Sequence, residues 1–390
     1  MATWLIDGVR TPFGRFGGSL RELSVVELGA QPLEALVGRH PWAPARAEEL
    51  VVGIAMIEGG FMVPARQIAV RASLPNSLPT LTVDRACCSG LTAAGVALRG
   101  LSTGGHCAIV LGADVMSRTP RLLHGSRFGT RLGDVLVEDL LLMRSPLAGR
   151  PIAAYAGTEA LQLGVTREMQ DEWALGSHQR YFAARERGYF DGEISPLTVR
   201  EGLLQHDEQP RSDTSLAKLA ALPLVYDSPT VTAGNAPGLN DGACALLIGD
   251  DTMVRKSGTT PLARIHSYVQ IADSPTSAVW LPGVAISVLA DRAGVRLEEL
   301  DVIEVNEAYA ATPLASIRHA AAGDVELEKQ LLGRANTCGG AVAIGHPTGA
   351  SGARILLTAA RRLSTEGGKF AAVAICGGFG QADAMLLERP

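Results

Sequence analysis

The sequence predicts an α/β protein in which helices cover a mostly parallel sheet. Strand patterns and helix patterns alternate along residues 1–118 and again beyond residue 240, which is the order that βαβ units produce. Hydrophobic residues make up 47% of the 390 residues, which is ample for a large core, and this length indicates two or three domains. The 44 glycines and few aromatic residues favour tight turns and closely packed helices over disorder.

The N-terminal part of the chain shows clear hydrophobic periodicity. Strands are expected over residues 4–7, 50–56, 79–83 and 107–111, and helices over residues 25–37, 64–73 and 89–98. The alternation stops between residues 117 and 239, where arginines, prolines and glycines interrupt short apolar runs. One long helix is expected there, over residues 167–187 with Thr166 as its N-cap. We interpret this middle segment as an insertion on one side of the sheet.

The alternation resumes in the C-terminal part. Strands are expected over residues 243–248, 262–270, 302–305, 370–376 and 382–387, and helices over residues 284–293, 307–321 and 353–363. The order of these elements resembles that of the first part. This similarity suggests two duplicated halves, although the residues themselves show no strong repeat.

Composition narrows the classes of function. A net charge of −5 and the lack of a basic run argue against nucleic-acid binding. Six cysteines without regular spacing are typical of reduced cytosolic thiols rather than of a disulfide framework. The first residues show no signal-peptide pattern, and no apolar run approaches the roughly 18 residues of a membrane span. Scarce lysine beside abundant arginine and alanine hints at a bacterial source, and no metal-ligand spacing is visible.

The pair Cys87-Cys88 stands where an expected strand ends and an expected helix begins. The unpaired N–H groups of a first helical turn point at a side chain in this place, and their field favours a thiolate over a thiol. We therefore expect a lowered pKa, which suits a nucleophile. The alternative is a buried structural cysteine, which is the usual role of this residue type.

His346 lies in the most informative segment, the glycine-dense stretch from Gly339 to Arg354. Glycines let the backbone approach a ligand closely, and Pro347 favours an extended conformation at His346, just ahead of a helix. Such a histidine could accept the proton of a cysteine or donate to a developing oxyanion. The alternative is an ordinary surface histidine.

Two further polar residues each follow a buried strand. Cys376 ends the strand expected over residues 370–375, and a glycine-rich run that includes Gly378 comes next. Because ligands bind at the carboxyl ends of strands in parallel sheets, this thiol could act as an acid or base, and the adjacent N–H groups could bind an oxyanion. Asn306 could hold a water or a carbonyl, although taken alone it is better explained as a helix N-cap.

The ordered set of motifs resembles the thiolases, the family of acetyl-CoA acetyltransferase and 3-ketoacyl-CoA thiolase. The resemblance covers nearly the whole chain, and its C-x-S-G motif selects Cys87 rather than Cys88 as the nucleophile. The matching segments are Arg10 to Gly14, Cys87 to Gly90, Thr232 to Asn235, Leu239 to Ala243, Asn306 to Ala310, Gly345 to Gly352 and Cys376 to Gly380.

This resemblance implies two similar α/β halves that form a five-layer αβαβα core with an inserted loop domain over the substrate. The implied N-terminal half comprises residues 1–118 and 241–261, the loop domain residues 119–240, and the C-terminal half residues 262–390. It also implies a homodimer or homotetramer, and acyl-CoA and CoA as substrates. No permanently bound cofactor, metal, nucleic acid or membrane is expected.

The resemblance further implies a role for each candidate catalytic residue. Cys87 attacks the 3-keto carbonyl of a 3-ketoacyl-CoA after activation by His346. Cys376 protonates the acetyl-CoA enolate that leaves, and free CoA then takes the acyl group; the reverse reaction is a Claisen condensation. One oxyanion hole would use His346 and a water held by Asn306, and the other the N–H groups of Cys87 and Gly378. The implied substrate-binding residues are Ser215, Ala233, Ala308 and Tyr309.

Several substrate-facing positions depart from the family pattern. Pro237 replaces a frequent serine, Phe379 a common glycine and Asp84 a frequent asparagine. Residues 151–159 and 273–282 also differ from the family, and the second segment brings Trp280 close to the expected pocket wall. Because the catalytic set is intact and the substrate-facing set is not, we expect a different or bulkier acyl group than that of acetoacetyl-CoA.

Two alternative functions remain open on the sequence alone. One is a decarboxylating ketosynthase, which shares the fold and the cysteine nucleophile but uses two histidines. Cys376 and Asn306 occupy the positions that distinguish the two, which disfavours this alternative. The other is a thiolase-like protein that binds acyl-CoA with little activity of its own.

Overall fold

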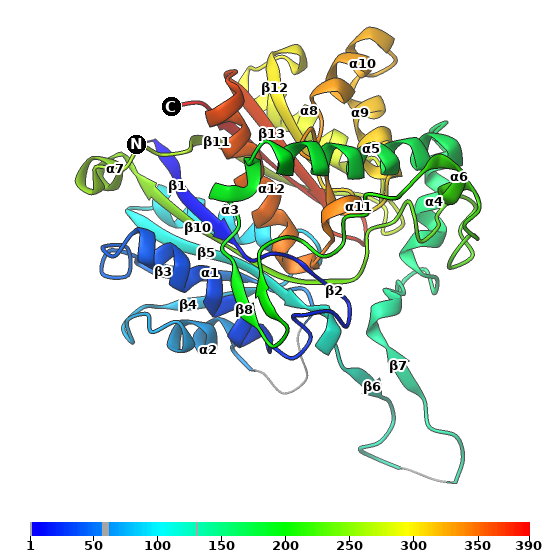
Figure 1. Cartoon of the computed structure of the whole chain (residues 1–390), viewed down its shortest axis with the longest axis horizontal. Coiled ribbons are helices and arrows are strands. Elements are labelled where there is room, and N and C mark those ends of the chain that lie inside the picture. Colours follow the sequence, from blue (N-terminus) through cyan, green and yellow to red (C-terminus); the bar gives the residue numbers. More distant parts are fainter. Residues whose placement is uncertain (1, 57–61, 130–131) are drawn as a thin grey trace.

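A ten-stranded mixed sheet runs through the chain in the computed structural model, which describes residues 2–56, 62–129 and 132–390 (Figure 1). The strand order is β12-β13-β14-β11-β1-β10-β5-β3-β4, and β2 pairs with β10. These strands are β1 (Thr3–Arg10), β2 (Gly14–Arg15), β3 (Glu49–Gly53), β4 (Thr80–Val83), β5 (Cys107–Val115), β10 (Asn240–Asp250), β11 (Ala263–Ala272), β12 (Leu300–Val305), β13 (Phe370–Cys376) and β14 (Gln381–Glu388).

The expectation of a mostly parallel sheet is wrong. Strand β3 pairs with β4 and β5 in parallel, and β12 pairs with β13 in parallel, but the remaining pairs are antiparallel. Strand β13 connects to β14 through only residues 377–380, a hairpin too short for the helical crossover that a parallel pair needs. Each half of the chain thus adds antiparallel strands to a small parallel unit.

Two helices lie between the two halves of the sheet. Helices α3 (Ser89–Ser102) and α12 (Thr348–Glu366) pack against each other, and α12 contacts β5 and β10 on one side and β12 and β13 on the other. Helices α1 (Val25–Arg39) and α2 (Pro64–Arg71) cover the outer face of the N-terminal strands. Helices α8 (Leu281–Ala293) and α9 (Ala311–Ala320) cover the outer face of the C-terminal strands. The result is the five-layer arrangement that the resemblance implied.

The middle segment forms smaller elements outside these layers. The ribbon of β6 (Arg121–Leu123) and β7 (Val137–Asp139) projects away from the body of the molecule (Figure 1). The other elements are α4 (Ile152–Gln162), α5 (Arg167–Glu186), β8 (Leu197–Val199), β9 (Gly202–Leu204) and α6 (Leu216–Ala220). Thr166 caps α5, as its sequence predicted, by accepting a hydrogen bond from the Met169 N–H. Three further helices, α7 (Asp251–Ser257), α10 (Val325–Arg334) and α11 (Ala341–Ile344), belong to the flanking parts.

Two helices near the expected site begin elsewhere than predicted. Helix α9 begins at Ala311 rather than at Glu307, so Asn306 lies outside the helix and is not its N-cap. Helix α12 begins at Thr348 rather than at Ala353, directly after His346 and Pro347. Its residues from Thr348 to Ala360 are all buried, so the start of this helix is held rigidly at the centre of the molecule.

Candidate active site

The turn that carries Cys87 links β4 to α3 in a strained conformation. Ala86 has a φ of 48°, which residues with a Cβ rarely adopt. The Ser89 hydroxyl donates to the Ala86 carbonyl at 2.6 Å and accepts from the Arg85 N–H at 2.8 Å. Asp84 Oδ1 accepts from the Ala86 N–H at 2.9 Å. These hydrogen bonds hold the Cys87 side chain at the end of the strand.

The two adjacent cysteines have different surroundings. The Cys88 side chain is fully buried, and its thiol donates to the Ile375 carbonyl of β13 at 3.3 Å. Cys87 is half-buried and lines a cavity. Of these two thiols, Cys87 is therefore the one that a ligand can reach.

A glycine and an asparagine set the position of His346. Gly345 has a φ of 110°, and a Cβ there would lie 2.5 Å from the Asn240 side chain, so only glycine fits. Asn240 belongs to β10, and its Oδ1 accepts from the His346 N–H at 3.0 Å. The glycine-rich loop is thus anchored to the sheet immediately before α12 begins.

The hydrogen bonds of His346 fix its tautomer. Ser351 Oγ donates its proton to the Pro347 carbonyl at 2.9 Å, so it accepts from His346 Nδ1 at 2.6 Å. His346 Nε2 therefore carries no proton, and Asn306 Nδ2 lies 3.5 Å from it. Asn306 Oδ1 is buried and has no hydrogen-bond partner among the described residues. An imidazole in this state can accept a proton through Nε2.

Burial dominates the ionisation of these side chains. It lowers the pKa of His346 to about 3, and Arg354 adds to this effect, so the imidazole is neutral near pH 7. Burial raises the pKa of Cys87, and Cys376 and Asp114 raise it further. The expected lowering of the Cys87 pKa by the helix is therefore wrong. Burial also raises the pKa of Cys376 to about 12, against the opposing effect of backbone N–H groups, including that of Gly378.

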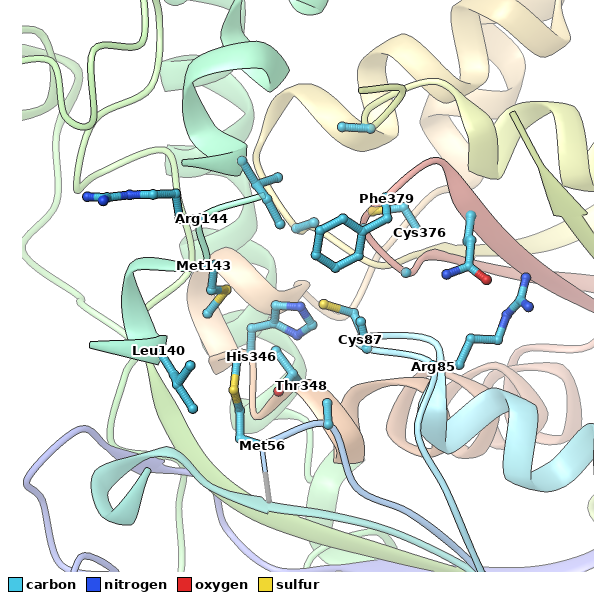
Figure 2. Close-up of a pocket in the computed structure, with 18 of the residues that line it drawn as sticks. Met56, Arg85, Cys87, Leu140, Met143, Arg144, His346, Thr348, Cys376 and Phe379 are labelled. Carbon is cyan, nitrogen blue, oxygen red and sulfur yellow. The ribbon is translucent and has the colours of Figure 1, made fainter. Parts of the chain in front are cut away.

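Six of the nine predicted site residues line one cavity of about 490 Å³. These six are Cys87, His346, Cys376, Gly378, Ala308 and Tyr309. Figure 2 shows Cys87, His346 and Cys376 together at this cavity, although they come from three distant segments of the chain. Asn306 does not line this cavity, but it contacts the imidazole as described above. The main catalytic candidates are thus close enough to act on one bound molecule.

Three residues predicted near the substrate lie elsewhere. Ala233 lines a second cavity of about 220 Å³, and Ser215 caps α6 by accepting from the Lys218 N–H. The Trp280 indole donates to Glu159 at 2.6 Å and packs against His319, while Ala278 lines the main cavity. Trp280 is thus near the cavity, as expected, but its side chain does not line it.

The sequence reasoning missed Asp114, a buried carboxylate at the end of β5. It accepts from the N–H groups of Ala55 and Met56 and from the Thr348 hydroxyl and the Gly349 N–H. Asp114 therefore ties the loop after β3 to the start of α12, beside the cavity. Its place near the carboxyl end of a buried strand is the same signal that drew attention to Cys376. Burial raises the pKa of Asp114 to about 6.

The arrangement is suited to acyl transfer through a thioester. A half-buried thiol, a neutral imidazole with an unprotonated Nε2 and a second thiol share one cavity. The first thiol can attack a carbonyl, the imidazole can take its proton, and the second thiol can exchange a proton with a carbon or sulfur atom of the ligand.

Comparison with known families decides the assignment. A model of the thiolase N-terminal domain matches residues 3–251, and a model of the thiolase C-terminal domain matches residues 259–389. The chain belongs to the thiolase family. Members of this family are acyltransferases, so the thiolase reaction of this chain is CoA-dependent cleavage of a 3-ketoacyl-CoA or the reverse condensation.

Individual relatives agree with this family assignment. The chain is 39% identical to the β-ketoadipyl-CoA thiolase of Pseudomonas aeruginosa over 403 residues, which cover 99% of this chain and 98% of the relative. It is 36% identical to the acetyl-CoA acetyltransferase of Escherichia coli, over 99% of this chain and 98% of the relative. These relatives do not favour the ketosynthase or the inactive binding protein considered above.

Solved thiolase structures share the fold over the whole chain. The crystal structure of human mitochondrial 3-ketoacyl-CoA thiolase superposes with a TM-score of 0.92 at 32% identity, and covers 100% of this chain and 99% of that chain. The same human enzyme has been solved in complex with CoA, also with a TM-score of 0.92.

Brief treatment with limiting iodoacetamide is expected to modify Cys87 before Cys88, Cys107, Cys244 or Cys338. These four cysteines are buried and do not line the main cavity, whereas Cys87 is half-buried and open to it. Peptide mapping by mass spectrometry measures the order of modification. His346→Gln is the matched variant, and it should slow labelling of Cys87 because the proton acceptor is removed. Faster labelling of Cys88 would show that the wrong thiol has been assigned.

The buried neutral state of His346 predicts a pH dependence of stability. Its pKa is about 3 in the folded chain and about 6.5 when unfolded, so the unfolded chain binds more protons between these values. Stability is therefore lost as the pH falls through this window. Between about pH 7.5 and pH 4.5, wild type should lose about 3 kcal/mol more unfolding free energy than His346→Gln, measured by urea denaturation.

If wild type and His346→Gln lost the same free energy of unfolding over this pH range, His346 would not be a neutral buried imidazole. Comparing the two proteins isolates His346 from other groups. Burial also raises the pKa of Asp114 and Asp241 to about 6, and these carboxyls act in the opposite direction in both proteins.

Proposed function

We propose that this thiolase works through an acyl-enzyme formed on Cys87, with His346 as the base and Cys376 as the acid. The observation that carries this proposal is the presence of both thiols and the neutral imidazole at one cavity. The raised pKa of Cys87 means that its proton leaves only when His346 accepts it as the substrate arrives.

Cleavage proceeds in two half-reactions. The Cys87 sulfur attacks the 3-keto carbonyl while its proton moves to His346 Nε2. The carbon–carbon bond then breaks, its electron pair goes to the acetyl-CoA enolate, and Cys376 protonates the enolate carbon. In the second half, the Cys376 thiolate takes the proton of free CoA, and the CoA sulfur takes the acyl group. The Cys87 thiolate finally regains its proton from His346.

Two sets of donors stabilise the negative oxygens. Once His346 has accepted a proton, its Nε2–H can donate to the thioester oxygen of the enolate. The unpartnered Oδ1 of Asn306 is suited to holding a water as the second donor. The N–H groups of Cys87 and Gly378 form the second set, for the oxyanion made by attack on the ketone.

We also propose CoA as the co-substrate and the middle segment, residues 119–240, as its cover. Residues 138–140 and 143–144 of that segment line the main cavity. Arg211 and Lys218 line the second cavity with Ala233, and Lys218 pairs there with Asp213 at 2.7 Å. The guanidinium of Arg211 suits the phosphates of CoA. Ser215 lies between Arg211 and Lys218 in sequence, and we propose that it also contacts CoA.

A homo-oligomer is part of the proposal. Strand β4 is an edge of the sheet and exposes Leu81, and the projecting ribbon exposes Phe128 and Leu136. Open edges and apolar patches of this kind favour contact with a second copy, as a dimer or a tetramer. Light scattering of the purified protein distinguishes a dimer from a tetramer.

We place this activity in the cytoplasm of a bacterium, in fatty acid or related acyl-CoA metabolism. The curated relatives from Pseudomonas and Escherichia support a bacterial setting. Within residues 2–56, 62–129 and 132–390, no helix is long and apolar enough to cross a membrane.

One assay tests the proposed function. Purified protein, CoA and a panel of 3-ketoacyl-CoA substrates should show CoA-dependent loss of the ketoacyl absorbance and formation of acetyl-CoA. The Cys87→Ala protein is the control for background cleavage. If every chain length is inert with wild type, the proposed function fails.

A further inference from the structure

Three residues at the main cavity hold a strained backbone. Ala86, Met143 and Phe379 have φ values of 48°, 45° and 51°, in the left-handed region that residues with a bulky side chain rarely occupy. Strain of this kind persists where the surrounding structure gains from it, and it concentrates at ligand sites. Phe379 is the largest of the three side chains.

The Phe379 ring is not part of the hydrophobic core. It is half-buried, and it belongs to none of the four hydrophobic clusters formed by the described residues. Its neighbours Gly378 and Gly380 also have positive φ, so the loop would accept glycine at position 379. Figure 2 shows the ring beside Cys376, within the cavity that Cys87 lines.

The facing wall of the cavity is apolar and adaptable. Met56, Leu140 and Met143 line it on the side of His346 (Figure 2). Methionine side chains are flexible and polarisable, so they fit acyl groups of different shapes. An acyl group held between Met143 and Phe379 would contact a flexible thioether on one side and an aromatic ring on the other.

The charged residues that line the cavity either bind other residues or point away from Cys87. Arg85 pairs with Asp383 at 3.0 Å, and the Arg144 side chain points away from Cys87 (Figure 2). The remaining acidic residues have partners of their own: Asp84 with the Ala86 N–H, Glu138 with His124, and Asp139 with Arg121. Among the residues that the structure describes, a carboxylate at the end of an acyl chain would therefore find no unpaired cation directed toward Cys87.

We propose that Phe379, facing Met56 and Met143, selects 3-ketoacyl-CoA substrates whose acyl group is apolar and larger than acetyl. This inference rests on the proposed function and names the substrate class of the same site. Phe379 is the specificity-determining residue, because its ring supplies apolar contact next to the acyl–sulfur bond. The strained φ is retained because glycine would remove that contact.

The first experiment compares three substrates with the wild-type protein. Acetoacetyl-CoA carries the smallest acyl group, 3-ketooctanoyl-CoA an apolar chain, and 3-ketoadipyl-CoA a chain that ends in a carboxylate. The kcat/KM for 3-ketooctanoyl-CoA should exceed both others by at least about tenfold. A higher kcat/KM for 3-ketoadipyl-CoA or for acetoacetyl-CoA overturns the inference.

The second experiment uses Phe379→Gly. The ratio of kcat/KM for 3-ketooctanoyl-CoA to that for acetoacetyl-CoA should fall about tenfold, and Phe379→Leu should restore part of it. The melting temperature of Phe379→Gly should not fall, since glycine relieves the strained φ. The matched control is Ser73→Gly, which relieves a φ of 54° at the exposed end of α2 and should leave the ratio unchanged.

The outcomes separate this inference from the proposed function. Cleavage by Phe379→Gly with an unchanged substrate ratio overturns the role of Phe379 and leaves the thiolase chemistry standing. A wild-type protein that cleaves none of the three substrates overturns the proposed function itself.

Discussion

Replacing Cys87 by alanine is expected to lower kcat/KM for 3-ketoacyl-CoA cleavage by at least about 10⁴-fold, the scale seen when an essential nucleophile is removed. Without the sulfur, no acyl-enzyme forms, so the half-reaction with free CoA has no acyl donor. The effect should appear in kcat rather than in KM, because the main cavity keeps its shape. Steady-state assays with CoA in excess measure both constants.

Cys88→Ala is the matched control for this variant. Its thiol faces the Ile375 carbonyl in the buried layer between the two halves, so its loss removes one weak hydrogen bond and leaves a small cavity. We expect a lower melting temperature and a nearly normal kcat. If Cys87→Ala keeps a tenth of wild-type activity while Cys88→Ala loses it, the two thiols have been assigned in the wrong order.

Replacing Cys376 by alanine is expected to lower the rate of cleavage by about 10²- to 10⁴-fold, the usual contribution of a positioned acid or base. Its pKa of about 12 keeps this thiol protonated in the resting enzyme, so it can supply the proton that the acetyl-CoA enolate needs. The first transfer of an acyl group to Cys87 should survive in this variant, because Cys87 and His346 are untouched.

Cys338→Ala is the control for Cys376→Ala, since Cys338 is buried and does not line the main cavity. It should retain normal cleavage. Undiminished cleavage by Cys376→Ala would show that another group protonates the enolate, and the proposed acid would be wrong.

The catalytic candidates could be found from the sequence because each follows a local rule. Cys87 and Cys376 stand at the ends of predicted strands, and His346 stands in a glycine-dense loop before a helix. The rule places each cysteine at or after the carboxyl end of a strand in its own parallel unit, and the packing of α3 against α12 between the two halves brings the two units together. The antiparallel pairs that join the halves were missed, because pairing direction depends on distant partners.

The Cys87 pKa and the contacts of Asp114 and Trp280 could not be predicted. They depend on burial and on long-range contacts, which the hydrophobic periodicity of the sequence does not reveal. The Cys87 pKa is raised because desolvation outweighs the field of the helix, and the depth of burial is set by the whole fold. Asp114 joins the loop after β3 to the start of α12, and it is 235 residues from Gly349 in sequence. Trp280 turns to Glu159 instead of the cavity because its indole N–H needs a buried acceptor.

The most direct test of the central claim is to locate the acyl group on the enzyme. Cys376→Ala is incubated with hexanoyl-CoA, quenched in acid and digested, and its cysteine peptides are analysed by mass spectrometry, with Cys376→Ala/His346→Gln as the control. A hexanoyl group on Cys87, formed more slowly in the control, is the predicted result. A hexanoyl group on Cys88, or a Cys87 peptide that stays unmodified, would contradict it.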